Sequence, residues 1–213
     1  DIDRAASLAA SGAYANSGQR CTAVKRILVA ESCADRFVQR LAEITEDTSY
    51  GDPENPGTSV GTVIDQGAAS RIEERVRDAC ARGAKLVTRF ERQGALVKPV
   101  VLDHVSPEAT LVSAETFGPV APVIRFKTID EAISIANATP FGLSAGICTD
   151  RLDWITRCIA ELQVGGVNIW EVPGYRLEVT PFGGIKDSGT GVKEGVQECC
   201  KAFTNVKTYS LPW

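Results

Sequence analysis

The feature that most constrains the fold is a regular alternation of strand-like and helix-like segments in the second half of the chain. Short runs of β-branched and other apolar residues indicate strands, and segments with apolar residues at helical spacing separate them. Because helices of about ten residues can connect neighbouring parallel strands, the pattern predicts an α/β fold with a mainly parallel sheet covered by helices. The expected strands span 85–88, 97–102, 120–126, 144–148 and 166–170, and the expected helices span 130–138 and 152–162.

The first part of the chain predicts three helices and one buried strand. Asp65 is a suitable N-cap for a helix over 66–82, and Gly83 is a suitable end for it. The run Asn16-Ser17-Gly18 predicts a turn after an opening Ala-rich helix. The remaining expectations are a helix over 2–14, a strand within 24–29, a helix over 37–44 and a loop over 51–61.

The end of the chain predicts a long loop, a helix and a final strand. Glycine and proline concentrate in residues 173–191, which indicates the loop. A helix is expected over 193–203, followed by a short strand with Tyr209 and Leu211 on one face. We therefore predict one domain over residues 1–204 and a C-terminal strand over 205–213 that pairs with another subunit or sheet.

Composition excludes several classes of protein. The 213 residues include 23 Lys and Arg against 27 Asp and Glu, a net charge of -4, and the two signs are mixed along the chain. A nucleic-acid binder is therefore not expected, and no apolar run is long enough to cross a bilayer. The 7 cysteines are an odd number in a chain that does not need disulfides, which predicts reduced thiols and a cytoplasmic location.

A metal centre is not expected either. His104 is the single histidine, and the cysteines show no C-x-x-C spacing, so the ligand sets typical of zinc are missing. His104 follows Asp103 and precedes Ser106-Pro107, which is typical of the end of a strand. We predict a structural place for His104.

Residues 16–23, with the sequence Asn-Ser-Gly-Gln-Arg-Cys-Thr-Ala, are the strongest candidate for a reactive site. Arg20 places positive charge beside Cys21, and a glycine-containing turn between a helix and a strand exposes the thiol. Positive charge favours the thiolate, which is the nucleophilic form of cysteine. Taken alone, a single cysteine is more often a small core residue, and both interpretations stay open on these residues.

Three ordered motifs resemble those of the aldehyde dehydrogenase superfamily. Residues 16–21 resemble its N-x-G-Q-x-C signature, residues 115–119 resemble its E-x-F-G-P motif, and residues 181–189 resemble its P-F-G-G-x-K-x-S-G motif. The likeness runs over essentially the whole chain. It implies that residues 1–204 form the α/β catalytic domain of this family, which carries the nucleophile.

The resemblance assigns roles to individual residues. Cys21 would be the nucleophile that adds to a small-molecule aldehyde, and a backbone N–H would hold the oxyanion. Hydride would leave to NAD or NADP, and water would hydrolyse the resulting thioester. Glu115 would accept hydrogen bonds from the hydroxyls of the nicotinamide ribose, and Phe117 would pack on the nicotinamide. Without the motif, Glu115 would be interpreted as a solvated loop acid and Phe117 as a core aromatic residue.

Two arginines indicate an anionic substrate. Arg20 precedes the nucleophile, and Arg176 lies five residues before Pro181, where the family commonly has an apolar or aromatic pocket residue. The planar guanidinium suits a phosphate, phosphonate or carboxylate, whereas the alternative is that these arginines pair with acids such as Glu171 or Glu178. The chain most resembles the phosphonoacetaldehyde dehydrogenase-like branch. Non-phosphorylating glyceraldehyde-3-phosphate and lactaldehyde dehydrogenases are its close neighbours.

Several parts of the family's active site have no counterpart in the chain. The general base belongs to an E-L-G-G-K-type motif well upstream of the nucleophile, and the chain starts at Asp1, without Met and close to Cys21. The amide that completes the oxyanion hole and the dinucleotide-binding half also lie upstream in the family. We therefore expect a domain fragment, inactive alone, of an enzyme that is a homodimer or homotetramer when full length.

Two other interpretations remain. One is a non-enzymatic α/β fragment or paralogue that serves assembly and has no redox role of its own. The other, a thiol hydrolase, is weaker because the hydrolytic base would be missing. Iodoacetamide labelling distinguishes an enzyme from an assembly protein, since an activated Cys21 reacts ahead of the other cysteines.

Overall fold

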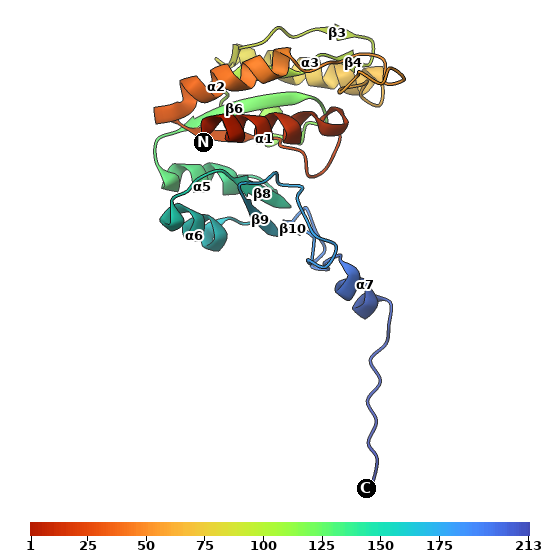
Figure 1. The fold of residues 1–213 in the computed structure, drawn as a ribbon. Helices are drawn as coiled ribbons and strands as arrows, with labels where there is room; N and C mark the ends of the chain where they lie inside the picture. Colours follow the sequence, from red (N-terminus) through yellow and green to blue (C-terminus); the bar gives the residue numbers. More distant parts are fainter.

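The computed structural model describes residues 1–213 and shows helices layered on both sides of a central sheet (Figure 1). The sheet has four strands in the order β1-β6-β5-β2. These are β1 (Ile27–Ala30), β6 (Val120–Phe126), β5 (Val100–Asp103) and β2 (Lys85–Leu86). Both β1 and β5 run parallel to β6, and β2 is antiparallel to β5. The prediction of an α/β fold with a mainly parallel, helix-covered sheet is confirmed.

The central sheet is buried on both faces because successive side chains of its strands point to opposite sides. Val100 and Leu102 of β5 belong to one core, whereas Val101 belongs to the other. The first core lies under α3 (Gln66–Ala81) and α4 (Thr110–Ser113), and the second lies under α1 (Ile2–Tyr14) and α2 (Glu31–Glu46). This two-sided burial explains why the three parallel strands are mainly apolar, with Arg125 and Asp103 toward the ends of β6 and β5.

A second layer follows the central sheet along the chain and lies below it in Figure 1. Its strands β8 (Ser144–Ile147) and β9 (Gly166–Ile169) pair in parallel, next to α5 (Ile129–Asn137) and α6 (Leu152–Glu161). Short elements complete the fold: η1 (Ala15–Gly18), the pair β3 (Arg92–Gln93) and β4 (Leu96–Val97), the pair β7 (Phe141–Gly142) and β10 (Ile185–Lys186), and α7 (Val196–Ala202).

The expected elements of the first part agree with the structure in most respects. The opening helix occupies the expected residues, and Asp65 caps α3 by accepting a hydrogen bond from the Ala68 N–H at 2.6 Å. Gly83 follows α3 with a φ of 101°, the left-handed conformation of a helix end. Helix α2 begins at Glu31, earlier than the expected start at residue 37. The prediction missed this start because the first turn carries exposed polar residues, which give no apolar periodicity.

The C-terminal segment differs from the expectation of a strand. Residues 205–213 form no strand, and no sheet edge of the chain pairs with them. Val206 and Tyr209 are 95% and 84% exposed, and the segment extends away from the domain in Figure 1. The helix before it, α7, is shorter than the expected 193–203. Pairing of this segment with another subunit stays a prediction.

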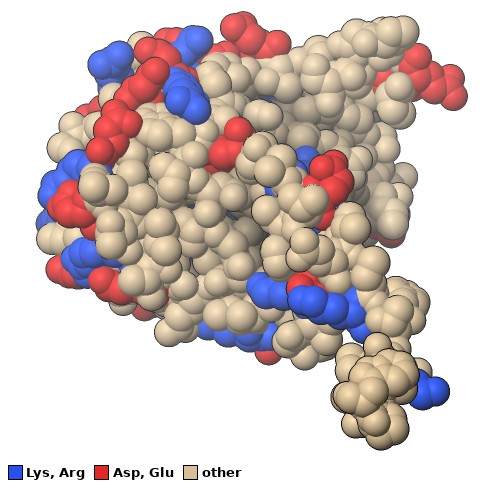
Figure 2. Space-filling model, turned by 60° about the horizontal axis from the view of Figure 1, so that its bottom comes forward, with Lys and Arg blue, Asp and Glu red and all other residues tan.

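Two features of the structure concern its helices and its charged surface. No helix of the structure combines the length and the apolar character that crossing a membrane requires. On the face drawn in Figure 2, side chains of both signs lie mostly toward the edges.

Candidate active site

Residues 16–23, here called the Cys21 loop, begin with a left-handed turn that redirects the chain after α1. Asn16, Ser17 and Gly18 have φ values of 53°, 56° and 70°. Consecutive left-handed residues are unfavourable for side chains other than glycine, so the surrounding structure must hold them in place. The turn leads directly to Cys21, whose thiol is exposed.

Hydrogen bonds tie this turn to the segment before α3. The Ser17 hydroxyl donates to the carbonyl of Gly61 at 3.1 Å. The Gln19 amide donates to the carbonyl of Thr62 at 3.3 Å and accepts from the N–H of Ile64 at 2.7 Å. Gln19 is one of the fixed letters of the first motif, and these contacts explain why a residue with both a donor and an acceptor stands there.

The second motif contacts the Cys21 loop through two glycines. A Cβ added at Gly18 would lie 2.1 Å from the carbonyl oxygen of Gly118, so only glycine permits this approach. Arg75 of α3 holds the other end of the motif by donating to the Glu115 carbonyl, and to the Thr116 hydroxyl at 2.9 Å. The Glu115 carboxylate makes no hydrogen bond within the chain, although the residue is half-buried. The ring of Phe117 is 41% exposed.

Lys25 connects these two segments and is a residue that sequence reasoning missed. Its Nζ donates to the carbonyls of Gly18 and Thr116, at 3.1 and 3.2 Å, and lies 3.9 Å from the centroid of the Phe117 ring. Burial lowers the pKa of Lys25 to about 8, although the negative charges of Glu115 and Cys21 oppose the shift. The available signal was a charged pair, Lys25-Arg26, inside an otherwise apolar run.

The third motif is anchored by two lysines beside the second layer. Lys186 donates to the carbonyls of Asn137 and Thr139, at 2.9 and 3.0 Å. Lys193 donates to the carbonyls of Gly165 and Gly183. These bonds tie the glycine-rich loop to the second layer, because the two lysines donate to backbone carbonyls of Asn137, Thr139 and Gly165.

All three motifs reach one cavity of about 1050 Å³. Its lining includes Cys21, Glu115, Phe182, Gly183 and Gly184. The backbone N–H of Cys21 has no acceptor within the chain. The structure thus brings the predicted nucleophile and one predicted cofactor-binding residue to a common space.

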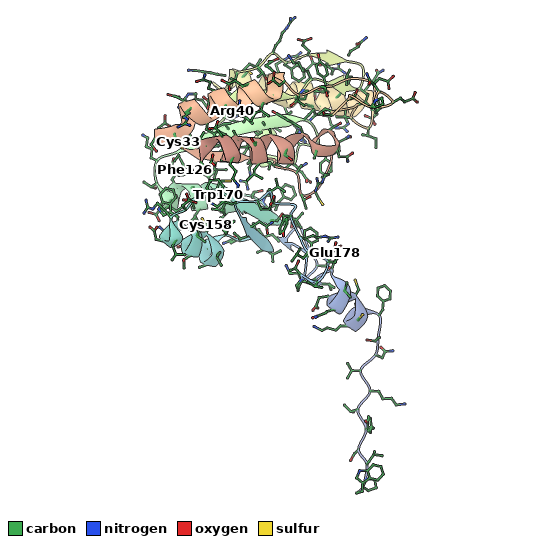
Figure 3. All side chains as sticks on the ribbon, in the orientation of Figure 1. Cys33, Arg40, Phe126, Cys158, Trp170 and Glu178 are labelled. Atoms are coloured by element: carbon green, nitrogen blue, oxygen red, sulfur yellow. The ribbon has the colours of Figure 1, made fainter.

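The same cavity extends between the central sheet and the second layer. Cys33 and Phe126 line it from the upper side, and Trp170 and Cys158 line it from the lower side (Figure 3). This end is mainly apolar, whereas the end near Cys21 carries Lys25 and Glu115.

The two predicted substrate-binding arginines are exposed, lie outside the cavity lining and come from two different loops. Arg20 donates to the hydroxyl of Thr22 at 3.2 Å, and a Cβ added at Gly174 would lie 2.9 Å from its Nη2 atom. Arg176 lies over the ring of Phe182, 4.8 Å from its centroid, and its Nη1 atom is 3.4 Å from a carboxylate oxygen of Glu194. Neither arginine pairs with Glu171 or Glu178, the acids considered in the sequence. The Glu194 pair is exposed and therefore weak.

Asn168 fixes the loop that carries Arg176, and sequence reasoning missed it too. Its side-chain amide donates to the carbonyls of Val172, Pro173 and Tyr175, at 3.1, 3.2 and 3.1 Å. A polar residue inside the otherwise apolar strand Gly166–Ile169 was the signal for this role.

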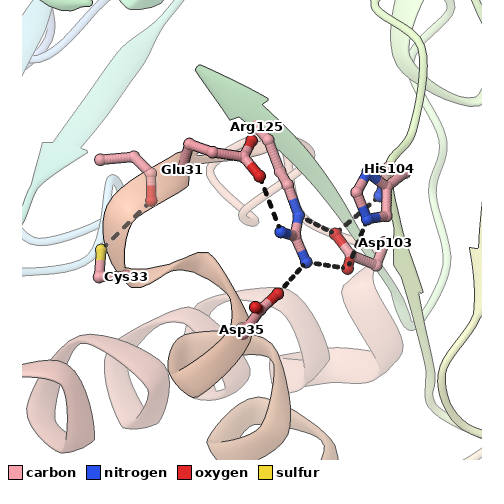
Figure 4. A network of polar contacts seen from close by, with 7 residues as sticks. Glu31, Cys33, Asp35, Asp103, His104 and Arg125 are labelled. Carbon is pink, nitrogen blue, oxygen red and sulfur yellow. Dashed lines mark hydrogen bonds and ion pairs between the residues drawn. The ribbon is translucent and has the colours of Figure 1, made fainter. Parts of the chain in front are cut away.

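His104 lies where the sequence predicted, directly after β5. It has a φ of 54°, and its Nε2 atom is 3.6 Å from a carboxylate oxygen of Asp103. Asp103 itself binds Arg125 in a polar network with Glu31 and Asp35 of α2 (Figure 4). The structure contains no group of three His, Cys, Asp or Glu side chains arranged to hold a metal ion.

The fold and the three converging motifs define the class of protein: the chain belongs to the aldehyde dehydrogenase family, whose sequence profile matches residues 1–209. It is 39% identical to NADP-dependent glyceraldehyde-3-phosphate dehydrogenase of Streptococcus equinus, over 98% of the chain and 43% of that protein. It is 36% identical to sulfoacetaldehyde dehydrogenase of Neptuniibacter caesariensis, over 98% of the chain and 45% of that protein.

A solved structure confirms the fold. Glyceraldehyde-3-phosphate dehydrogenase of Methanocaldococcus jannaschii, in complex with NADP, superposes with a TM-score of 0.92 at 35% identity. The match covers 97% of the chain and 45% of that protein. The chain therefore spans a little under half the length of the proteins it resembles.

Proposed function

We propose that this chain is the nucleophile-bearing part of an NAD(P)-dependent aldehyde dehydrogenase that oxidises a small anionic aldehyde to its acid. The observation that carries the proposal is the meeting of Cys21, Glu115 and the 182–184 segment at one cavity. An exposed thiol with a free backbone N–H beside it supplies a nucleophile and an oxyanion donor at one place.

The residues present fit a nicotinamide cofactor. The Glu115 carboxylate has two acceptor oxygens without a partner in the chain, which suits ribose hydroxyls, and the exposed ring of Phe117 suits packing on a flat ring. When bound, such a cofactor accepts hydride.

In the proposed reaction, the Cys21 thiolate adds to the aldehyde carbon, and a new S–C bond forms while the carbonyl electrons move to oxygen. The N–H of Cys21 donates to the resulting oxyanion. A bound nicotinamide cofactor would supply the hydride acceptor, and loss of hydride from the thiohemiacetal carbon would leave a thioester on Cys21. Water then cleaves the S–C bond, which releases the acid and returns the thiol.

The substrate class is proposed from Arg20 and Arg176 and from two relatives. A Cβ added at Gly174 would lie 2.9 Å from Arg20 Nη2, and the guanidinium of Arg176 lies over the ring of Phe182, a residue that lines the cavity. Guanidinium groups suit phosphate and sulfonate oxygens. Two of the proteins named above are named for anionic aldehydes, glyceraldehyde 3-phosphate and sulfoacetaldehyde. The phosphonoacetaldehyde-like branch stays a prediction.

The test uses the polypeptide of the complete reading frame and follows reduction of NAD and NADP. Glyceraldehyde 3-phosphate, sulfoacetaldehyde and phosphonoacetaldehyde are compared with propionaldehyde as the neutral control. We expect turnover that Cys21→Ser abolishes, and a loss in kcat/KM of about tenfold or more for the anionic aldehydes in Arg176→Ala, with propionaldehyde unaffected. Arg89→Ala, at an exposed site distant in sequence, is the matched control. No turnover with any aldehyde would overturn the proposal.

We further propose that residues 1–213 have no dehydrogenase turnover by themselves. The support is that the upstream general-base motif expected from the resemblance is not among these residues, and that the chain spans 43% of its Streptococcus equinus relative. Measurable NAD or NADP reduction by the 213 residues alone would refute this.

The alternative of a non-enzymatic assembly role is separated by labelling. Cys148, Cys199 and Cys200 are exposed like Cys21, so they are internal controls for accessibility. If Cys21 is the nucleophile, substoichiometric iodoacetamide modifies it ahead of these three thiols. Equal labelling of all four supports the assembly role.

We also propose that residues 205–213 pair with another copy of the chain and that residues 1–204 form the catalytic domain. The support is the extended, exposed state of this segment, whose apolar side chains have no partner in the chain. A homodimer or homotetramer is the expected assembly.

A further inference from the structure

The ammonium group of Lys25 occupies the junction between the Cys21 loop and the motif that begins at Glu115. It donates to Gly18 on one side, at 3.1 Å, and to Thr116 on the other, at 3.2 Å. No other side chain in the structure hydrogen-bonds to both segments. Besides the close packing of Gly18 on Gly118, this ammonium group is therefore what joins the Cys21 loop to the segment that carries Phe117.

We propose that Lys25 is a positioning residue of the dehydrogenase reaction proposed above: its ammonium holds the Cys21 loop against the Thr116–Phe117 segment, and its charge attracts the thiolate form of Cys21. The inference rests on that proposed function for its catalytic meaning. It goes beyond the function because none of the three motifs includes Lys25.

The contacts favour a cation over a neutral donor at this place. Two carbonyl oxygens point their negative ends at Nζ, and the face of Phe117 lies 3.9 Å away. Both carbonyl dipoles and an aromatic face attract positive charge, and partial burial strengthens this attraction. A neutral amine would keep the hydrogen bonds but lose the attraction to the ring and to the thiolate.

The charged groups around Lys25 come from three segments: the Cys21 loop, the motif that begins at Glu115, and α3. Cys21 faces it from its own loop, and Glu115 faces it from the second motif. Arg75 of α3 reaches the same motif, where it binds the carbonyl of Glu115. Because burial lowers the pKa of Lys25 to about 8, the lysine loses its charge in the mildly alkaline range.

This geometry predicts an effect on thiol chemistry that does not require turnover. In the polypeptide of the complete reading frame, we compare the iodoacetamide rate of Cys21 at pH 7 in wild type, Lys25→Met and Lys25→Arg. Lys25→Met is expected to react about threefold to tenfold more slowly, because it removes the hydrogen bonds that hold the Cys21 loop and a positive charge that attracts the thiolate. Lys25→Arg is expected to retain the wild-type rate. Lys201→Met, which removes an exposed lysine paired with Glu198, is the control.

It also predicts a change in the pH profile of kcat. Wild type is expected to lose activity near pH 8 as Lys25 deprotonates, and Lys25→Arg is expected to move this alkaline limb upward by at least about one pH unit, because arginine stays charged. In Lys25→Met, kcat is expected to fall more than the KM for aldehyde rises. The reason is that a changed distance between the Cys21 loop and the Thr116–Phe117 segment affects the chemical step after binding.

The outcomes separate this inference from the proposed function. An unchanged Cys21 alkylation rate in folded Lys25→Met overturns the inference, whatever the enzyme does. If Lys25→Met does not fold, the alkaline limb of Lys25→Arg decides, and a limb that stays near pH 8 overturns it. If wild type shows no dehydrogenase activity, the proposed function fails, and the alkylation rates still test the attraction between Lys25 and Cys21.

Discussion

Two glycines determine how closely the Cys21 loop approaches the second motif. Gly18 has a φ of 70°, and its position leaves no space for a side chain beside the carbonyl of Gly118. Gly118 in turn faces Ile72, because a Cβ there would lie 2.3 Å from Ile72 Cδ1. Both glycines are motif letters, and the structure gives the steric reason for each.

Gly18→Ala is expected to destabilise the protein by about 2 to 3 kcal/mol, because overpacking against backbone adds to the unfavourable left-handed conformation. Gly83→Ala is the matched control, since Gly83 also has a positive φ, of 101°, but no atom within 4 Å of an added Cβ. Its expected loss is about 1 kcal/mol, from conformation alone. Urea unfolding measures both, and equal losses would show that the contact with Gly118 contributes nothing.

At the scale of single residues, the sequence predicted those roles that follow from motif letters. Cys21, Glu115 and Phe117 are motif residues, and the structure brings their segments together, while their catalytic roles stay predictions. Lys25 was not predicted, because its importance comes from contacts with Gly18 and Thr116, and Thr116 lies 91 residues away. Contacts of this kind depend on the pairing of distant strands and leave only a faint local pattern.

At the scale of elements, one arginine ties a helix to two strands. Arg125 of β6 donates to both carboxylate oxygens of Asp103 on β5, at 3.1 and 2.6 Å, and to Glu31 and Asp35 of α2 (Figure 4). The side chains of Arg125 and Asp103 are only 11% and 8% exposed. Burial raises the pKa of Asp103, but the hydrogen bonds from Arg125 and from the His104 N–H outweigh it, so the pKa lies below its usual value.

This network makes the free energy of unfolding depend on pH in the acid range. Because the pKa of Asp103 is lower in the folded state, its contribution is complete above the unfolded-state pKa of about 4 and disappears as pH falls through the folded-state value. Arg125→Met leaves Asp103 buried without its partner, and is expected to destabilise the protein by about 3 kcal/mol at pH 7. The difference from wild type should shrink below pH 4, as Asp103 becomes protonated.

Urea unfolding of wild type and Arg125→Met at several pH values between 2 and 7 checks this prediction. Arg82→Met is a suitable control, since Arg82, directly after α3, forms an exposed pair with Asp78 of that helix, and its loss should change stability far less. A difference that does not vary with pH would assign the effect of Arg125 to packing rather than to its charge.

The end of β9 controls the loop that carries Arg176. Asn168→Asp replaces an amide, whose two N–H groups are shared among three carbonyls, with a carboxylate that repels the same carbonyls. We expect amide exchange of Tyr175, whose N–H donates to Val172, to accelerate about tenfold or more, while exchange in β6 stays unchanged. Asn137→Asp, which disturbs a different hydrogen bond in the same layer, is the control. Equal exchange in both variants would contradict the proposed clamp.

Most elements followed from the sequence, whereas their pairing did not. The strand Val120–Phe126 and the helix cap at Asp65 rest on local patterns and are confirmed. The order β1-β6-β5-β2 joins segments far apart in the chain, and the registers that pair Ile27 with Val123 and Val100 with Val120 depend on packing from both faces. Short pairs such as β7 with β10 carry no periodicity at all, because two residues cannot show one.

At the scale of the whole molecule, the C-terminal segment is where the sequence and the single chain disagree. The alternation of its side chains predicts a strand, and a strand requires a neighbouring edge to form hydrogen bonds. The chain offers none beside residues 205–213, and Trp213 is 96% exposed. Large apolar side chains exposed in a row are typical of a surface that associates. A partner that supplies such an edge, as proposed above, would reconcile the pattern with the structure.

Removal of residues 205–213 tests this view of the tail. If the segment pairs with a second copy, sedimentation velocity of the polypeptide of the complete reading frame should show a dimer or tetramer that the truncation converts to a smaller species. Because the removed residues make no sheet contact within the chain, the unfolding midpoint of the separated monomer should change little. The double variant Tyr209→Ser, Leu211→Ser keeps the backbone and removes the apolar face, so it is expected to weaken association less than truncation. If the intact and the truncated polypeptides have the same oligomeric state across a hundredfold range of concentration, the pairing is contradicted.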